Sequence, residues 1–74
     1  TQARPSPDAI LVKALAQAGV GDVDKALTLL EQAVKVYPNI SDLQFELGRV
    51  YLAKRQMPQA EAAFRKAVEA KPTD

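Results

Sequence analysis

Apolar residues recur every three or four positions in four stretches of the chain, at about residues 7–18, 23–36, 41–54 and 58–70. A period near 3.6 places such residues on one side of an α-helix, so each stretch predicts an amphipathic helix. The pattern therefore predicts an all-α fold built from helical hairpins. In chain order, the four stripes consist of Ile10, Leu11, Ala14, Leu15 and Ala18; Val23, Ala26, Leu27, Leu30, Ala33 and Val34; Leu43, Leu47, Val50 and Tyr51; and Ala60, Ala63, Phe64, Ala67 and Val68.

Capping residues and glycines mark the ends of the first two predicted helices. Ser6 fits an N-cap, and Pro7 fits the first helical position, where its missing N–H costs nothing. Gly19 and Gly21 frame a tight turn between the helices. Asp22 follows this turn and can cap the second helix.

The third predicted helix has the strongest start signal in the chain. Pro38 ends the second helix, because the residue before a proline is pushed out of the α region. Ser41 followed by Gln44 matches a capping box, in which the serine is the N-cap. Ile40 before the cap and Phe45 inside the helix could then form a hydrophobic staple.

Composition excludes several classes of function. The chain has no Cys and no His, so it forms no disulfide, and zinc would lack its preferred ligands. The usual catalytic bases and nucleophiles are missing as well, and we expect no enzyme activity, cofactor or metal. A formal net charge of +1 gives no electrostatic reason to expect nucleic acid as a partner. No apolar run approaches the roughly 20 residues that span a membrane, so we expect a soluble protein. The compartment is not fixed by the sequence, and the cytoplasm is weakly favoured.

A shift of the sequence by 34 residues aligns the second half of the chain with the first. The few identical pairs mark the second helix of each predicted hairpin and the proline that follows it. This placement predicts two repeats, residues 7–40 and 41–74, preceded by a linker or chain edge at residues 1–6. The identical pairs are Asp8 and Asp42, Ala26 and Ala60, Ala33 and Ala67, Val34 and Val68, and Pro38 and Pro72.

The second repeat resembles the tetratricopeptide repeat signature. Gln44 departs from that pattern where a large residue is usual, and the first helix of the first repeat departs at Lys13, Ala14 and Gln17. The resemblance implies antiparallel helix pairs stacked in a right-handed superhelix. The signature residues are Leu47, Gly48, Tyr51, Ala60, Phe64, Ala67 and Pro72 in the second repeat, and Ala26, Leu30, Ala33 and Pro38 in the first.

Small and large residues alternate within this signature in a way that suits a tight helix pair. A glycine inside a helix costs about 1 kcal/mol relative to alanine, so Gly48 should be needed for close approach of a second helix. Ala60 and Ala67 are small for the same reason, while Tyr51 and Phe64 can fill the space beside them.

The resemblance also implies a function in protein binding, on a concave face formed by the first helix of each repeat. Some family members hold a partner's terminal carboxylate at such a face, but here only Arg49 among the matching positions could pair with one. A peptide or amphipathic helix with an acidic residue suits the face better. Packing for Leu11 and Leu15 and solvation for Arg49 remain competing interpretations. The candidate partner-binding residues are Asp8, Leu11, Leu15, Ala18, Asp42, Phe45, Arg49, Leu52 and Ala53.

Other interpretations stay open at this stage. At least three helical repeats are normally needed for stability, so two repeats favour a longer parent protein or self-association into a homo-oligomer. An RNA-binding helical repeat would have a more basic groove, and a plain four-helix bundle would not need Gly48. The sequence names neither the partner nor the cellular process.

Overall fold

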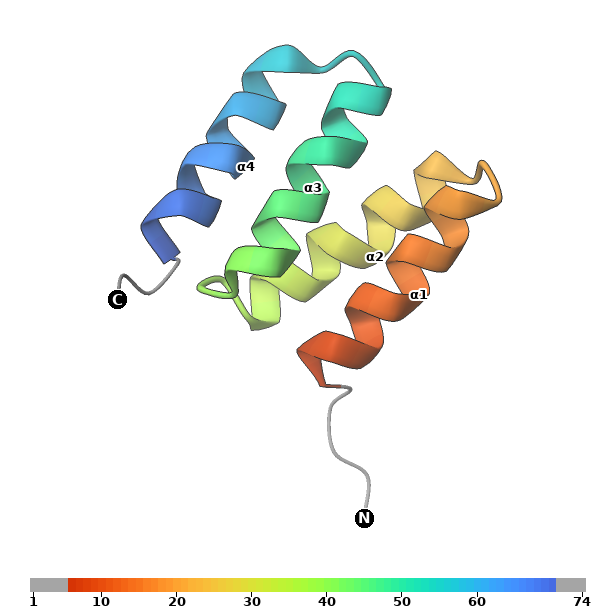
Figure 1. Cartoon of the computed structure of the whole chain (residues 1–74), viewed down its shortest axis with the longest axis horizontal. Helices are drawn as coiled ribbons and strands as arrows, with labels where there is room; N and C mark the ends of the chain where they lie inside the picture. The colour runs from red at the N-terminus through yellow and green to blue at the C-terminus, as the bar shows by residue number, and fades with distance from the viewer. Residues whose placement is uncertain (1–5, 71–74) are drawn as a thin grey trace.

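The computed structural model describes residues 6–70 as four α-helices and confirms the predicted all-α fold (Figure 1). The predicted linker, apart from Ser6, and Pro72 lie outside the described residues. Within residues 6–70, no helix is both long and apolar enough to cross a membrane. The helices are α1 (Pro7–Gly19), α2 (Val23–Val36), α3 (Ser41–Ala53) and α4 (Met57–Ala70).

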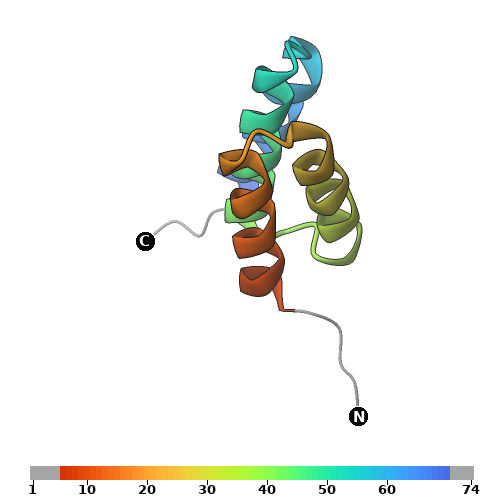
Figure 2. The same ribbon diagram turned by 90° about the vertical axis from the view of Figure 1, so that its right-hand side faces the viewer.

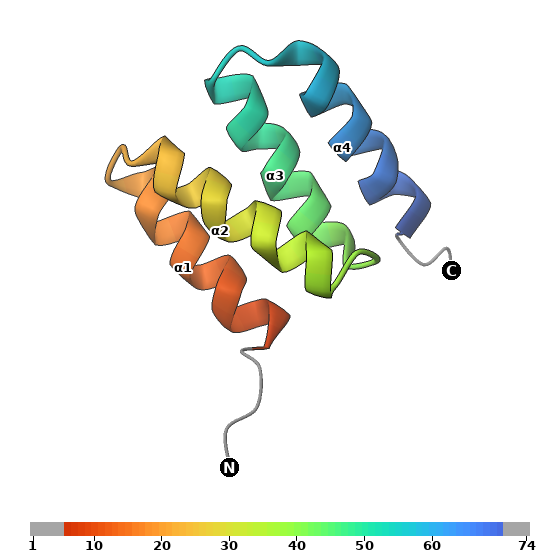
Figure 3. The same cartoon turned by 180° about the vertical axis from the view of Figure 1, so that it is seen from behind.

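The helices form two antiparallel hairpins, α1–α2 and α3–α4 (Figure 1). α3 is the central element, because it packs against α4 and also against α2 and α1. The side view shows α2 projecting to one side of the other helices (Figure 2), and the view from behind shows it in front, along the line where α1 and α3 meet (Figure 3).

Local chemistry explains the start of the first two helices. The Ser6 hydroxyl accepts a hydrogen bond from the Ala9 N–H at 3.1 Å, and Pro7 is the first helical residue. The Asp22 carboxylate accepts one from the Lys25 N–H at 3.2 Å. Both predicted N-caps are therefore confirmed, and each satisfies one of the helix N–H groups that have no partner inside the helix.

The predicted capping box at α3 is wrong. Ile40 is the N-cap, and no side chain at this position caps the helix by a hydrogen bond. Ser41 is already the first helical residue. The Ser41 hydroxyl instead donates to the Ala67 carbonyl at 2.8 Å. Because the last four carbonyls of a helix lack intrahelical N–H donors, Ser41 satisfies a group at the end of α4 rather than at the start of its own helix.

The other half of the capping box and the hydrophobic staple change with this register. Gln44 is buried, and its side-chain N–H donates to the Pro38 carbonyl at 3.0 Å. Ile40 packs against the core, whereas the Phe45 ring lies 5.4 Å from the Phe64 ring on α4. Ser41, Gln44 and Phe45, which the sequence suggested would interact locally at the start of one helix, thus contact other elements of the fold.

The core lies where α3 meets the first hairpin, and Leu30 and Leu43 are its largest fully buried side chains. Small residues dominate the rest, so the helices approach one another closely. The core cluster consists of Ala14, Ala26, Leu30, Ala33, Leu43, Leu47, Val50 and Ala63.

Gly48 is buried, and its missing side chain makes room for an aromatic ring. A Cβ added at Gly48 would lie 2.7 Å from both Cδ1 and Cε1 of Phe64. As expected, α3 needs a glycine at this position to pack against the next helix. The group that occupies the space is the Phe64 side chain.

Both hairpin turns place one residue in the left-handed region. Gly21 has φ 90° in the α1–α2 turn, and Arg55 has φ 62° in the α3–α4 turn. The two positions are equivalent under the 34-residue shift. Glycine adopts this conformation without strain, whereas arginine does not.

Candidate functional site

The predicted binding face is formed by α1 and α3, which lie side by side and in contact (Figure 1). Its apolar centre is partly open to solvent, since Leu15, Phe45 and Leu52 are 43%, 48% and 42% exposed. Leu15 comes from α1, and the other two come from α3, seven residues apart on one side of the helix. Both helices therefore present an exposed aliphatic or aromatic group.

Other predicted residues of this face serve the fold as well. Leu11 and Ala18 are partly buried and pack against the core cluster. Asp8 and Asp42 are exposed in the first turns of α1 and α3, where a negative charge is favoured by the helix dipole. Ala53 is exposed as the last residue of α3.

Arg49 is the cation of the predicted set and has an acidic neighbour. Its guanidinium lies 3.4 Å from a carboxylate oxygen of Glu46, and the Arg49 side chain remains 60% exposed. A guanidinium carries five N–H donors, so one such pair leaves donors free for a carboxylate supplied by a partner.

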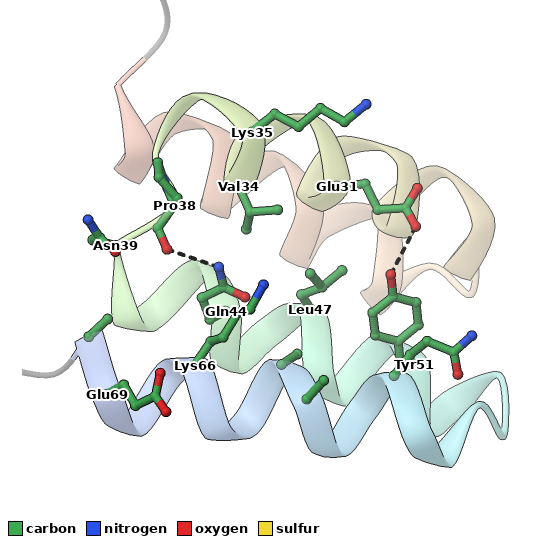
Figure 4. Close-up of a pocket in the computed structure, with 14 residues that line it drawn as sticks. Glu31, Val34, Lys35, Pro38, Asn39, Gln44, Leu47, Tyr51, Lys66 and Glu69 are labelled. Carbon is green, nitrogen blue, oxygen red and sulfur yellow. Dashed lines mark hydrogen bonds between the residues drawn. The ribbon is translucent and has the colours of Figure 1, made fainter.

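The structure also forms a groove that sequence reasoning missed, bordered by α2, α3 and α4 (Figure 4). Val34 and Leu47 contribute apolar surface to it. Charged residues on α2 (Glu31 and Lys35) and on α4 (Lys66 and Glu69) also line it. In the sequence, the spacing of four residues on α2 and of three residues on α4 indicates that each pair of charges lies on one solvated side of its helix. The spacing does not show that these sides of α2 and α4 face the same groove.

A hydrogen bond spans one end of this groove. The Tyr51 hydroxyl donates to a Glu31 carboxylate oxygen at 3.0 Å and so connects α3 to α2 (Figure 4). Burial raises the pKa of Tyr51 above its usual value of 10.0, and the hydrogen bond to Glu31 and the negative charge of that carboxylate raise it further. Each of these effects favours the neutral phenol, which can donate.

Among residues 6–70, no group of three or more His, Cys, Asp or Glu side chains is placed to hold a metal ion. Exposed apolar groups with a few charges nearby suit binding of a polypeptide.

A family model for the tetratricopeptide repeat matches residues 11–74. The chain belongs to the tetratricopeptide repeat family. Such repeats generally mediate protein–protein interactions. Over 64 residues the chain is also 34% identical to Superkiller complex protein 3 of Mus musculus. The alignment covers 86% of this chain and 4% of that protein, so the chain spans a small part of its relative. No solved structure matches this chain significantly.

The tetratricopeptide signature residues fall largely in the interior of the structure. Tyr51 and Phe64 are partly buried, and Pro38 is exposed in the turn after α2. The signature residues that are fully buried are Ala26, Leu30, Ala33, Leu47, Gly48, Ala60 and Ala67.

Proposed function

We propose that this tetratricopeptide module binds a segment of a partner protein on the face formed by α1 and α3. The observation that carries the proposal is the partial exposure of Leu15, Phe45 and Leu52 on two adjacent helices. Aliphatic and aromatic side chains left open on neighbouring rigid elements provide the apolar centre that helix-in-groove recognition requires. Arg49 adds one charged donor at this centre.

The chemistry of the face selects the kind of segment. Leu15, Phe45 and Leu52 favour an amphipathic helix or an extended peptide with large apolar side chains. Arg49 favours an acidic residue in that segment, because a guanidinium pairs with a carboxylate through two N–H groups. Asp8 and Asp42 lie at the start of α1 and α3 and disfavour a strongly acidic peptide end there.

A capture experiment with paired variants tests the proposal. The double variant Leu15→Ser with Arg49→Glu changes two exposed side chains of the face, so the fold should survive. Immobilised wild-type protein is expected to enrich a set of proteins from a lysate that this variant loses, as measured by quantitative mass spectrometry.

The matched control is Val20→Ser with Lys25→Glu, which changes one exposed side chain in the α1–α2 turn and one in the first turn of α2. This control should retain the wild-type set. Equal enrichment by the wild type and by Leu15→Ser with Arg49→Glu would refute binding at the α1–α3 face.

A further inference from the structure

A second apolar groove lies between α3 and α4. We call it the α3–α4 groove; it is lined by Ser41, Asp42, Phe45, Phe64, Ala67 and Val68. Val68 is 74% exposed, and Phe45 and Phe64 place their rings together. Leu52 follows Phe45 by seven residues on α3, and Met57 precedes Phe64 by seven residues on α4. Seven residues are about two helical turns, so Leu52 lies on the same side of α3 as Phe45, and Met57 lies on the same side of α4 as Phe64. Leu52 and Met57 are 42% and 54% exposed.

The first hairpin contains the equivalent groove, and there it is covered. Under the 34-residue shift, Phe64 corresponds to Leu30 and Val68 to Val34. Leu30 is only 1% exposed and Val34 is partly buried, because α3 packs against α1 and α2. Within residues 6–70, the same surface thus occurs once covered by a helix and once uncovered.

The covered form shows which side chains fill such a groove. α3 brings Leu43, Leu47 and Val50, all buried, and Tyr51, which is partly buried. Their spacing is i, i+4, i+7 and i+8, which forms one stripe along a helix. The geometry points to an amphipathic helix of a partner protein as the occupant of the α3–α4 groove, with large apolar residues at this spacing.

The charged residues beside the groove indicate which polar side chain the partner helix carries. In the first hairpin, Glu31 accepts the hydrogen bond from Tyr51 of the covering helix. The corresponding residue in the second hairpin is Arg65, which is exposed and lies 3.3 Å from Glu61. The second hairpin thus has a hydrogen-bond donor, Arg65, where the first has an acceptor, Glu31. The partner helix therefore carries a carboxylate at the position where α3 carries Tyr51.

A second copy of this chain does not supply such a helix through α1. The positions of α1 that correspond to Leu47 and Tyr51 are Lys13 and Gln17. Stacking α1 of another copy onto the α3–α4 groove would place the Lys13 ammonium where a buried leucine is needed, which is costly without a paired charge. The same surface would also bring only alanines, Ala9 and Ala16, at the positions of Leu43 and Val50.

A synthetic helix derived from α3 tests the proposal. The probe is a peptide of residues 40–54 with Phe45→Gln, Leu52→Gln and Tyr51→Glu, which keeps one apolar stripe and adds the carboxylate. A matched peptide keeps Tyr51. In NMR titrations of the labelled 74-residue protein, both peptides should shift the amide signals of Phe64 and Val68. The carboxylate peptide should bind about 2- to 5-fold more tightly, the range for an exposed ion pair.

Protein variants separate this groove from the α1–α3 face. Val68→Asp should abolish binding of both peptides, and Arg65→Glu should reverse their order of affinity. Both side chains are exposed, so folding should be retained and can be checked by circular dichroism. Leu15→Ser with Arg49→Glu changes the part of the α1–α3 face that lies outside Phe45 and Leu52, the two residues shared with the groove, and should leave peptide binding unchanged.

Three results would overturn the proposal. The first is absence of binding of either peptide at millimolar concentration. The second is a set of shifts centred on Leu30 and Val34, since the peptide would then be displacing α3. The third is sedimentation of the protein as a dimer that Val68→Asp dissociates, because a second copy would then cover the groove.

Discussion

Two polar side chains at the start of α3 form hydrogen bonds that reach beyond their own helix. Ser41 donates to the Ala67 carbonyl at the end of α4, and Gln44 donates to the Pro38 carbonyl in the preceding turn. Each bond satisfies a carbonyl that has no partner in a regular helix. Together they tie the start of α3 to two neighbouring elements, so these residues contribute to tertiary structure rather than to helix initiation.

The role of Ser41 can be separated from that of an N-cap. Ser41→Ala should lower the free energy of unfolding by about 1 kcal/mol, because a partly buried hydrogen bond is lost. Ser41→Asp should lower it at least as much, since a carboxylate cannot donate to the Ala67 carbonyl. Ser41→Thr keeps the donor and should restore most of the stability. Urea denaturation measures all three; a Ser41→Asp protein as stable as wild type would indicate capping instead.

The hydrogen bonds of single side chains could be predicted from the sequence where the bonding partner is only a few residues away. Ser6 and Asp22 each meet an N–H three residues away, and both were predictable from residue type and position. Ser41 and Gln44 fit an equally local rule, yet Ser41 finds its partner 26 residues away. A hydroxyl takes the best acceptor available, and Ala67 becomes available only when α3 and α4 pack together.

Among the elements, the turn between α3 and α4 carries conformational strain that its counterpart lacks. Arg55 has φ 62°, where the equivalent residue of the α1–α2 turn is Gly21. A side chain in the left-handed region costs about 1–2 kcal/mol, and glycine avoids most of this cost.

Arg55→Gly should therefore stabilise the protein by about 0.5–1 kcal/mol. Arg55→Ala is the matched control, because it removes the charge and the long side chain but keeps the Cβ. Thermal unfolding followed by circular dichroism should show a higher Tm for Arg55→Gly and little change for Arg55→Ala. Equal shifts in both variants would point to the arginine side chain rather than to its backbone conformation.

The helices could be predicted from the sequence, whereas the surfaces between them could not. The apolar period placed each helix end within one residue of its bounds in the structure. The groove bordered by α2, α3 and α4 combines residues such as Glu31, Leu47 and Lys66, and its shape depends on how the helices cross. The division at residues 40 and 41, and the binding role of the α1–α3 face, stay predictions.

For the whole molecule, contacts between α2 and α3 join the two hairpins. Leu43 and Leu30 form the apolar part of this junction. At the surface, Tyr51 donates to Glu31, and the Lys54 ammonium pairs with the Asp24 carboxylate. The exposed ion pair contributes little, so the phenol is the polar contact whose titration should affect stability.

Tyr51 should make the protein less stable at alkaline pH. Its pKa in the folded protein is raised, so the contribution of this group is complete below pH 10.0 and is lost as the pH rises through that value and above it. In urea denaturation between pH 8 and 11, Tyr51→Phe should show a shallower loss of stability than wild type. Glu31→Gln should fall between them, since burial of the phenol remains. Parallel curves for wild type and Tyr51→Phe would contradict this prediction.

The position of α4 has a consequence for how the molecule opens. Within residues 6–70, α4 packs on α3 alone, whereas α3 has three neighbours. Detaching α4 breaks one interface, the most extensive one, and exposes the buried Gly48, Ala60, Ala63 and Ala67, whereas detaching α3 breaks every interface except that between α1 and α2. Opening of this single interface would therefore separate α4 as one unit and leave the contacts among the first three helices intact.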